Sequence, residues 1–210
     1  MLRSKVFGAV ALLGICAYAS AGTMTFNGVD PLSGTVTIGG AHYNGEVYAG
    51  LLEFTESSLG NIQTVCVDLD HVISGGQSWP DSLFDSATYP DSGIEAAGNL
   101  VAADFANVHS ADDAVGLQLD VWKARYDGPA AATPDFSSGN FTASGMSSGA
   151  LAAADTFWQD RNTAGSATYI QSEDGHGQDQ MTVDPVPEPA SIGALLVGAL
   201  SLVRRKRKTA

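Results

Sequence analysis

Cys66 and Gln118 carry the two side chains of this sequence that are best suited to react with each other. Cys66 lies in Thr64–Leu69, a segment whose alternation predicts a β-strand that directs the thiol inward. Gln118 lies on a predicted helix, and the residues three and four positions from it are apolar: Ala114, Val115, Val121 and Trp122. A carboxamide on such a stripe is expected to be buried and to need a hydrogen-bond partner. If the strand packs against the helix, the thiol and the carboxamide meet in an apolar pocket.

The pattern around these two residues resembles the thioester domains of bacterial surface adhesins. In that family a cysteine at the end of an early strand is followed by Gln-x-Ala-hydrophobic-Trp on a helix. Here the matching residues, within positions 60–127, are Cys66, Gln118, Val121 and Trp122. The resemblance implies that the sulfur attacks the carboxamide, expels ammonia and leaves an internal thioester. A nucleophilic amine or hydroxyl on a target surface then opens that bond covalently.

Two positions depart from the family pattern. Val65 stands where thioester domains usually have an aromatic residue, and Asp120 replaces the alanine two residues after the glutamine. Asp120 is about 200° around the helix from Gln118, so we expect it on the opposite face, where it does not block the bond. A simpler alternative stays open, in which Cys66 only fills space in the core and Gln118 caps the backbone of a core strand.

Residues 185–210 have the composition of a sorting address. They contain a Pro-Glu-Pro box, made of Pro187, Glu188 and Pro189. The prolines hold this box extended, and an uncharged apolar run, Ile192–Val203, and a basic end, Arg204–Lys208, follow it. The order resembles the PEP-CTERM sorting signal of exported bacterial proteins, which implies processing by an exosortase. The alternative is an ordinary membrane anchor, but the run is shorter than the ~20 residues that span a bilayer.

The N-terminal residues 1–21 predict an export signal peptide. Two basic residues precede an apolar stretch, Val6–Ile15, and small residues then create cleavage sites after Ala19 and after Ala21. Cleavage at either site discards Cys16. We therefore expect an exported protein that stays transiently in the inner membrane and then reaches the cell surface or an extracellular matrix.

Cleavage leaves Cys66 as the only cysteine, so an intramolecular disulfide is excluded. The remaining body, residues 22–184, is expected to form a single extracellular domain. It holds 22 of the 23 acidic residues but only three of the ten basic ones, which are Lys123, Arg125 and Arg161. Nucleic-acid binding needs a basic face, so this composition excludes a nucleic-acid partner. Such an acidic domain is typical of a surface protein that stays solvated.

The body predicts an α+β fold: a β-rich, sandwich or barrel-like domain with a helical insert of two to three helices. We expect strands at Thr23–Phe26, Thr35–Ile38, Tyr43–Phe54, Ile62–Leu69, Ala167–Gln171 and Asp179–Val183. Tyr43–Phe54 is long enough to bend or bulge at Gly50. We expect helices that begin at a Ser92–Glu95 capping box, at Ser110–Asp113 and at Ser148. The segments 75–80 and 130–148 are expected to be irregular loops.

Other chemistry is less well supported by the sequence. Ser147, with His176 further along the chain, matches the order of a secreted hydrolase, but Ser/Gly-rich residues precede it where the nucleophile elbow requires a buried strand. Trp79 could stack on a sugar of an exopolysaccharide, as in a non-covalent carbohydrate-binding module, although packing over a strand edge is the simpler expectation. The His, Asp and Cys spacings predict no metal site and no cofactor.

The sequence therefore predicts a structural or adhesive protein and not an enzyme. Its expected partners are an exosortase-type processing enzyme, the membrane before processing, and an exopolysaccharide or a host or matrix surface.

Overall fold

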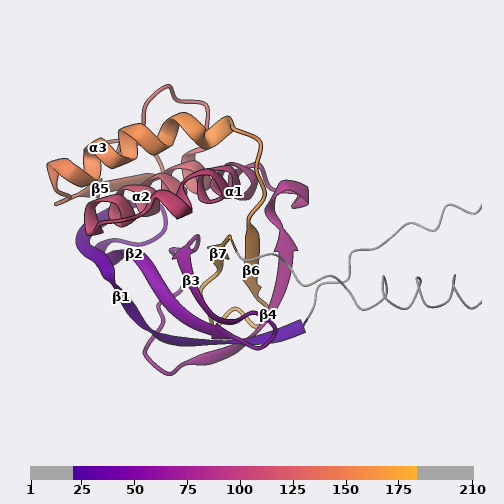
Figure 1. Cartoon of the computed structure of the whole chain (residues 1–210). Helices are drawn as coiled ribbons and strands as arrows, with labels where there is room; N and C mark the ends of the chain where they lie inside the picture. Colours follow the sequence, from indigo (N-terminus) through magenta and orange to yellow (C-terminus); the bar gives the residue numbers. More distant parts are fainter. Residues whose placement is uncertain (1–20, 184–210) are drawn as a thin grey trace, which may run out of the picture. The chain divides into compact units, whose positions relative to one another are not determined.

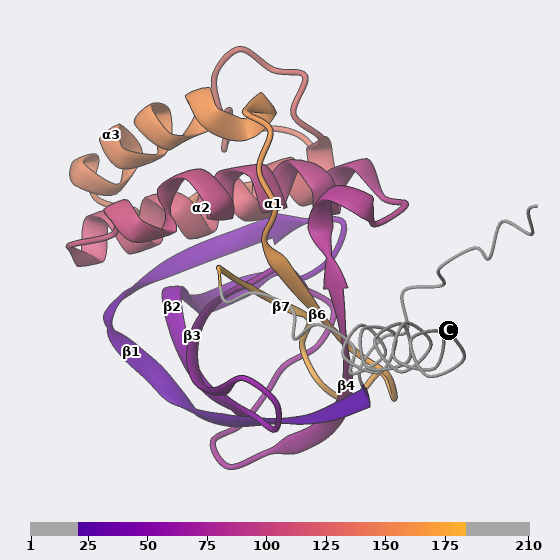
Figure 2. The same cartoon turned by 45° about the vertical axis from the view of Figure 1, so that its right-hand side comes forward.

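The computed structural model describes residues 21–183, and these contain a seven-stranded antiparallel sheet and three α-helices. The strands are β1 (Ala21–Gly40), β2 (Gly45–Glu56), β3 (Gly60–Cys66), β4 (Ser78–Asp85), β5 (Phe141–Ser144), β6 (Thr168–Ser172) and β7 (Gln180–Thr182). They pair in the order β2-β3-β7-β6-β4-β1-β5, and β1 also pairs with β2. Because of this last pairing, six strands form a closed ring, which is visible in Figures 1 and 2.

The first strand, β1, is a single long strand, so the prediction of two separate strands at Thr23–Phe26 and Thr35–Ile38 was wrong. It pairs with β2 along most of its length, with β4 through its first residues and with β5 through its last. Its register against β2 shifts between Val29 and Ser33, and Ser33 pairs with Gly50. The backbone φ of Gly50 is +126°, and a Cβ at this position would lie only 2.7 Å from Leu32 O. The bend predicted at Gly50 therefore needs glycine.

The three helices are α1 (Ser92–Asp104), α2 (Ala111–Asp127) and α3 (Ser148–Phe157). The start of α2 is confirmed, since the Ser110 hydroxyl accepts a hydrogen bond from Asp113 N. The capping box predicted for α1 was wrong by one residue. Its N-cap is Asp91, whose carboxylate accepts from the backbone N–H groups of Gly93 and Ile94.

Two strands, β4 and β5, were not predicted. The strand β4 begins inside the segment 75–80 and β5 lies within the segment 130–148, and both segments were expected to be irregular loops. The sequence of β4 contains a proline, two aspartates and two serines, which are poor strand formers. It is held as a strand because it pairs with β1 on one side and with β6 on the other. The short β5 pairs only with the last residues of β1. Local composition does not reveal such strands, because their hydrogen-bond partners are far away in the sequence.

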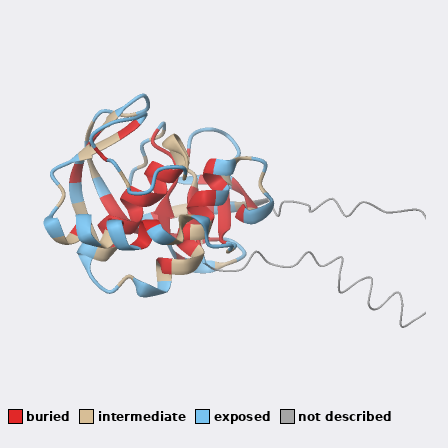
Figure 3. Ribbon diagram, turned by 90° about the horizontal axis from the view of Figure 1, so that it is seen from above, coloured by how far each residue is buried: buried red, intermediate tan, exposed pale blue. Residues whose placement is uncertain are grey.

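Helix α2 lies at the centre of the molecule. All residues from Ala114 to Ala124 are buried, and α2 packs on the strands on one side and on α1 and α3 on the other. Val115, Leu119 and Trp122 belong to a core cluster shared with the strands. Leu117 and Val121 belong to a second cluster, with residues of α1 and with Phe157 and Trp158 at the end of α3. Figure 3 shows the buried residues gathered in this central region. The predicted α+β, β-rich class with a helical insert is confirmed.

Among the helices of residues 21–183, none combines the length and hydrophobicity that a membrane-spanning segment requires. The predicted signal peptide and the sorting segment, including Pro187, Glu188 and Pro189, lie outside the described residues.

Candidate functional site

Cys66 is the last residue of β3 and is only 3 % exposed. Its thiol is not part of a disulfide, and it donates a hydrogen bond of 2.9 Å to the backbone oxygen of Asp68. Burial raises the pKa of this thiol far above its ordinary value, and the charge of Asp68 raises it further. The thiol is therefore neutral at physiological pH, and it lacks the depressed pKa of a cysteine that reacts with any electrophile in solution.

Gln118 binds the backbone of Cys66 through both polar atoms of its side chain. Its Oε1 accepts a hydrogen bond of 2.9 Å from Cys66 N, and its Nε2 donates one of 2.7 Å to Cys66 O. The next residue, Val67, donates its N–H to Asp179 O on the side of β3 that faces β7. Because the backbone groups of successive residues point to opposite edges of a strand, the N–H and C=O of Cys66 face the other edge of β3. The pairing of β2 with β3 ends at Thr64, and the glutamine amide takes the place of the missing strand.

The sequence thus correctly predicts that Gln118 is buried and that it lies at Cys66. With an exposed fraction of 1 %, Gln118 is as buried as the apolar residues around it. The contact also shows how the pair is held, since the carboxamide is fixed by the cysteine backbone while the thiol is engaged by Asp68 O. This arrangement fits the simple capping role, and it brings the Gln118 carboxamide to the backbone of the residue that carries the thiol.

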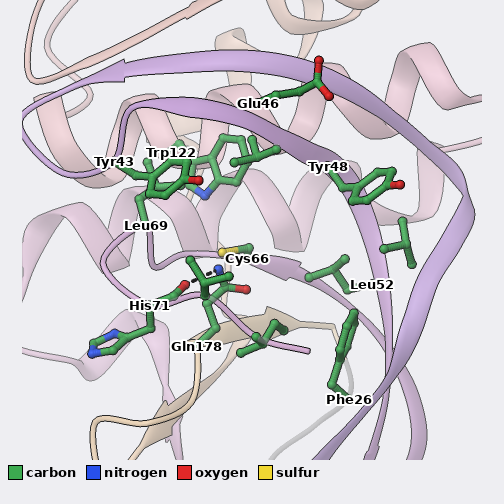
Figure 4. Close-up of a pocket in the computed structure, with 14 residues that line it drawn as sticks. Phe26, Tyr43, Glu46, Tyr48, Leu52, Cys66, Leu69, His71, Trp122 and Gln178 are labelled. Carbon is green, nitrogen blue, oxygen red and sulfur yellow. Dashed lines mark hydrogen bonds between the residues drawn. The ribbon is translucent and has the colours of Figure 1, made fainter. Parts of the chain in front are cut away.

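A cavity of about 290 Å³ reaches Cys66 from the outside. Its lining is mostly apolar and includes Phe26, Val29, Tyr43, Tyr48, Leu52, Leu69, Ile73 and Trp122. Figure 4 shows Cys66 among these side chains, with Tyr43 and Trp122 on one side and Tyr48 and Leu52 on the other. Tyr48 is 64 % exposed, so the cavity opens to solvent beside it. The sequence did not reveal this cavity, because its walls come from β1, β2, α2 and the loop after β3.

One polar group inside the cavity wall has no partner. The indole Nε1 of Trp122 is buried and makes no hydrogen bond to any described residue, although Trp122 is only 2 % exposed. Its N–H lies close enough to the sulfur to oppose the rise in the pKa of Cys66, but burial outweighs it. The indole N–H therefore faces the thiol, and it has no oxygen or nitrogen partner among the described residues.

Asp120, the departure from the family pattern, lies on the opposite face of α2, as predicted. It is fully buried, and neither of its carboxylate oxygens has a hydrogen-bond partner among the described residues. Burial raises its pKa well above the ordinary value, and the charges of Asp155 and Asp104 act in the same direction, while Arg161 opposes them. Val121, which also matches the pattern, packs against α1 and not into the cavity.

Tyr126 is a site residue that the sequence analysis missed. Its hydroxyl oxygen accepts a hydrogen bond of 2.7 Å from Leu69 N, just beyond Cys66. Gln118, Trp122 and Tyr126 are spaced four residues apart on α2, so they share one face, and this spacing is the signal that could have found Tyr126. Nearby, His71 Nδ1 lies 2.6 Å from Asp68 Oδ2, and this hydrogen bond raises the pKa of the imidazole.

The residues of the alternative functions lie elsewhere. Ser147 caps α3 by accepting a hydrogen bond from Ala150 N, and its hydroxyl donates to Asp112. His176 lies in the turn between β6 and β7, where its backbone bonds Asp174 and Gln77. Trp79, the candidate for sugar stacking, is 2 % exposed and packs edge-on against Phe54, so the simpler packing expectation is confirmed.

Within residues 21–183, no group of three or more His, Cys, Asp or Glu side chains is arranged to hold a metal ion. Comparison with known proteins adds no assignment, since no protein-family model, no curated protein and no solved structure matches the chain.

Proposed function

We propose that this chain is an exported, surface-displayed adhesive or structural protein whose body forms an internal thioester between Cys66 and Gln118. The observation that carries the proposal is the double hydrogen bond that holds the Gln118 carboxamide on the backbone of Cys66, a residue that lines an open cavity. The acidic body, the predicted export signal and the Pro-Glu-Pro segment support display outside the cell.

The geometry favours the acyl-transfer step in two ways. The Cys66 N–H already donates to Gln118 Oε1, so it stabilises the negative charge that develops on this oxygen when sulfur attacks the carboxamide carbon. The thiol proton goes to the leaving nitrogen, which departs as ammonia, and the S–C bond replaces the N–C bond. The pair is held in place before reaction, which removes much of the entropic barrier.

The cavity provides the route for the reaction with a target. A nucleophilic amine or hydroxyl that enters the cavity reaches Cys66, where it adds to the carbonyl carbon of the proposed thioester and releases the thiol. The apolar walls exclude bulk water from the bond and so slow its hydrolysis. A protein with this site acts once, by covalent attachment, and does not turn over.

The mass of the exported protein tests the thioester directly. We expect the intact protein to be lighter by one ammonia than its sequence, and we expect the Cys66 thiol to resist alkylation in denaturant until methylamine opens the bond. Gln118→Ala is expected to show its full calculated mass and a free thiol.

Gln180→Ala is the control, because Gln180 is also a buried glutamine. Its backbone pairs with Cys66 between β3 and β7, but its side chain bonds Thr64 and Gln178. It should keep the ammonia deficit. Full mass together with an alkylatable thiol in the unsubstituted protein would show that Gln118 is only a structural cap.

The proposed sorting is tested separately by mapping the terminal peptides of protein recovered from the producing cell. We expect a mature N-terminus at Ser20 or Gly22 and a C-terminus close to residues 187–191, because the signal peptide and the Pro-Glu-Pro box are both processing sites. An intact C-terminus at Ala210 in the membrane fraction would instead indicate a permanent anchor.

A further inference from the structure

Asp81 on β4 is a buried carboxyl group without a partner. It is fully buried, and neither of its oxygens makes a hydrogen bond to a described residue. Burial raises its pKa to about 7, and the nearby charges of Glu56 and Glu173 act in the same direction. An unpaired carboxylate in such a position is strongly unfavourable, so a cation bound there would stabilise the fold.

Glu56 on β2 adds a second buried carboxylate at the same place, with an exposed fraction of 1 %. Burial acts to raise its pKa, but hydrogen bonds from Ser58, Ser57 and Leu59 outweigh this effect and lower it, so Glu56 is ionised. Glu173, which follows β6, accepts a hydrogen bond from Ser82 next to Asp81. The local charge is therefore negative from three different elements.

None of the Lys and Arg side chains of residues 21–183 is bonded to these carboxylates. Lys123 pairs with Asp127 at 2.8 Å, and Arg125 pairs with Asp91 at 2.8 Å. Arg161 donates to the backbone oxygens of Pro129 and Trp158. All three basic residues of the body are thus bound to other groups.

The start of β1 lies beside these carboxylates. Gly22 pairs with Asp81 in the antiparallel register, and Figures 1 and 2 both show the first residues of β1 next to β4. An atom bonded to the Gly22 Cα in the side-chain direction would lie 3.0 Å from Ser57 Oγ and 3.2 Å from Asp81 Oδ1. It would overlap Glu56 Oε1, so the end of the flexible Glu56 side chain has to move back to hydrogen-bond distance. Three oxygens thus converge on one point, which matches the three N–H donors of an ammonium group.

We propose that cleavage of the chain between Ala21 and Gly22 creates an α-ammonium group that binds Glu56, Ser57 and Asp81, so that removal of the export signal completes the folded body. Hydrolysis adds water across the Ala21–Gly22 peptide bond, and the released amine takes up a proton. Once the bond is cut, rotation about the Gly22 Cα–C bond brings the nitrogen to the side-chain position, which is open because glycine has no Cβ. This inference rests on the proposed export. Of the two predicted cleavage sites, after Ala19 and after Ala21, it requires the one after Ala21.

The pairing has a definite pH dependence. Two carboxylates raise the pKa of the α-amine above its ordinary value of about 8. The resulting stabilisation is present below that ordinary value and is lost as the pH rises through the raised one. A chain that does not begin at Gly22 has no α-ammonium group at this position, so the pKa of Asp81 stays raised to about 7. Asp81 then favours folding only in acid and opposes it at neutral pH.

The test compares two exported full-length proteins, one with the natural leader and one with a single alanine inserted between Ala21 and Gly22. Mass spectrometry identifies the first residue of each mature chain, and thermal unfolding is measured at pH 7. We expect the natural protein to begin at Gly22 and Asp81→Asn to lower its midpoint by about 3 °C or more. In the alanine-extended protein the same substitution is expected to raise the midpoint, because it removes an unpaired carboxylate.

Glu53→Gln is the matched control, because Glu53 is an exposed carboxylate on β2, and it should shift neither midpoint appreciably. If Asp81→Asn prevents folding, acylation of the α-amine at pH 8 provides the second measurement. We expect slow labelling at Gly22 and fast labelling in the extended protein.

A mature chain that begins at Ser20 would overturn the ammonium site but leave the proposed export intact. The same conclusion would follow if Asp81→Asn shifted the unfolding midpoint equally in the two proteins, or if their α-amines were acylated at equal rates. An uncleaved N-terminus would overturn both.

Discussion

Replacing Gln118 with alanine in a Cys66→Ala background is expected to lower the free energy of unfolding by about 3–5 kcal/mol. The background removes the thiol, so a thioester plays no part in the measurement, while the backbone atoms of residue 66 that bind Gln118 remain. The substitution leaves a buried N–H and a buried C=O without partners and creates a cavity between α2 and β3. Denaturant unfolding of the two proteins at pH 7 measures the difference.

Gln159→Ala provides the control for this experiment, since Gln159 is an exposed glutamine whose side chain bonds only Asp155 O. We expect a change of less than about 0.5 kcal/mol there. A similarly small loss at Gln118 would show that water replaces the amide at the edge of β3 and that Gln118 does not join the helix to the strand.

Asp120→Asn is expected to raise the free energy of unfolding at pH 7 by roughly 1–3 kcal/mol. Asp120 is fully buried, its oxygens have no partner among the described residues, and burial raises its pKa well above its ordinary value. A carboxyl whose pKa is raised in the folded state favours folding only below its ordinary pKa, and this contribution is lost as the pH rises. Asparagine does not titrate, so it avoids the loss.

The pH profile separates this effect from a change in packing. We expect the gain from Asp120→Asn to be near zero at pH 3 and to grow as the pH rises towards 7, in a field set by Asp155, Asp104 and Arg161. Glu95→Gln, at an exposed carboxylate in the first turn of α1, should change stability by only a few tenths of a kcal/mol. A gain at Asp120 that does not change with pH would indicate repacking, and a loss at pH 7 would contradict the burial argument.

The helices and the burial of Gln118 could be predicted from the sequence because their causes are local. The cap at Ser110 and the apolar neighbours of Gln118 lie within one or two helical turns, so spacing alone places them. The same reasoning places Asp120 on the far face of α2, although not the absence of a partner for its carboxylate. The spacing of Leu151, Ala154 and Trp158 also predicts that all three face inward, but Leu151 is 40 % exposed, because the position of α3 on α2 is set by contacts that spacing does not contain.

The strands show the opposite dependence. Residues 78–80 were predicted to be loop and residues 81–85 were assigned to no element, yet together they become β4 because β1 and β6 lie on either side. In the same way, β1 is one strand because β2 pairs with it across a register shift. The sequence by itself determined which residues favour helix or strand and which side chains must be covered. Tertiary structure decided that the backbone of Cys66 lacks a neighbouring strand and takes Gln118 instead, and that Gly22, Glu56 and Asp81 meet from three strands. Such contacts depend on how a ring of strands closes, and closure is set by pairing between distant segments rather than by the preferences of any one of them.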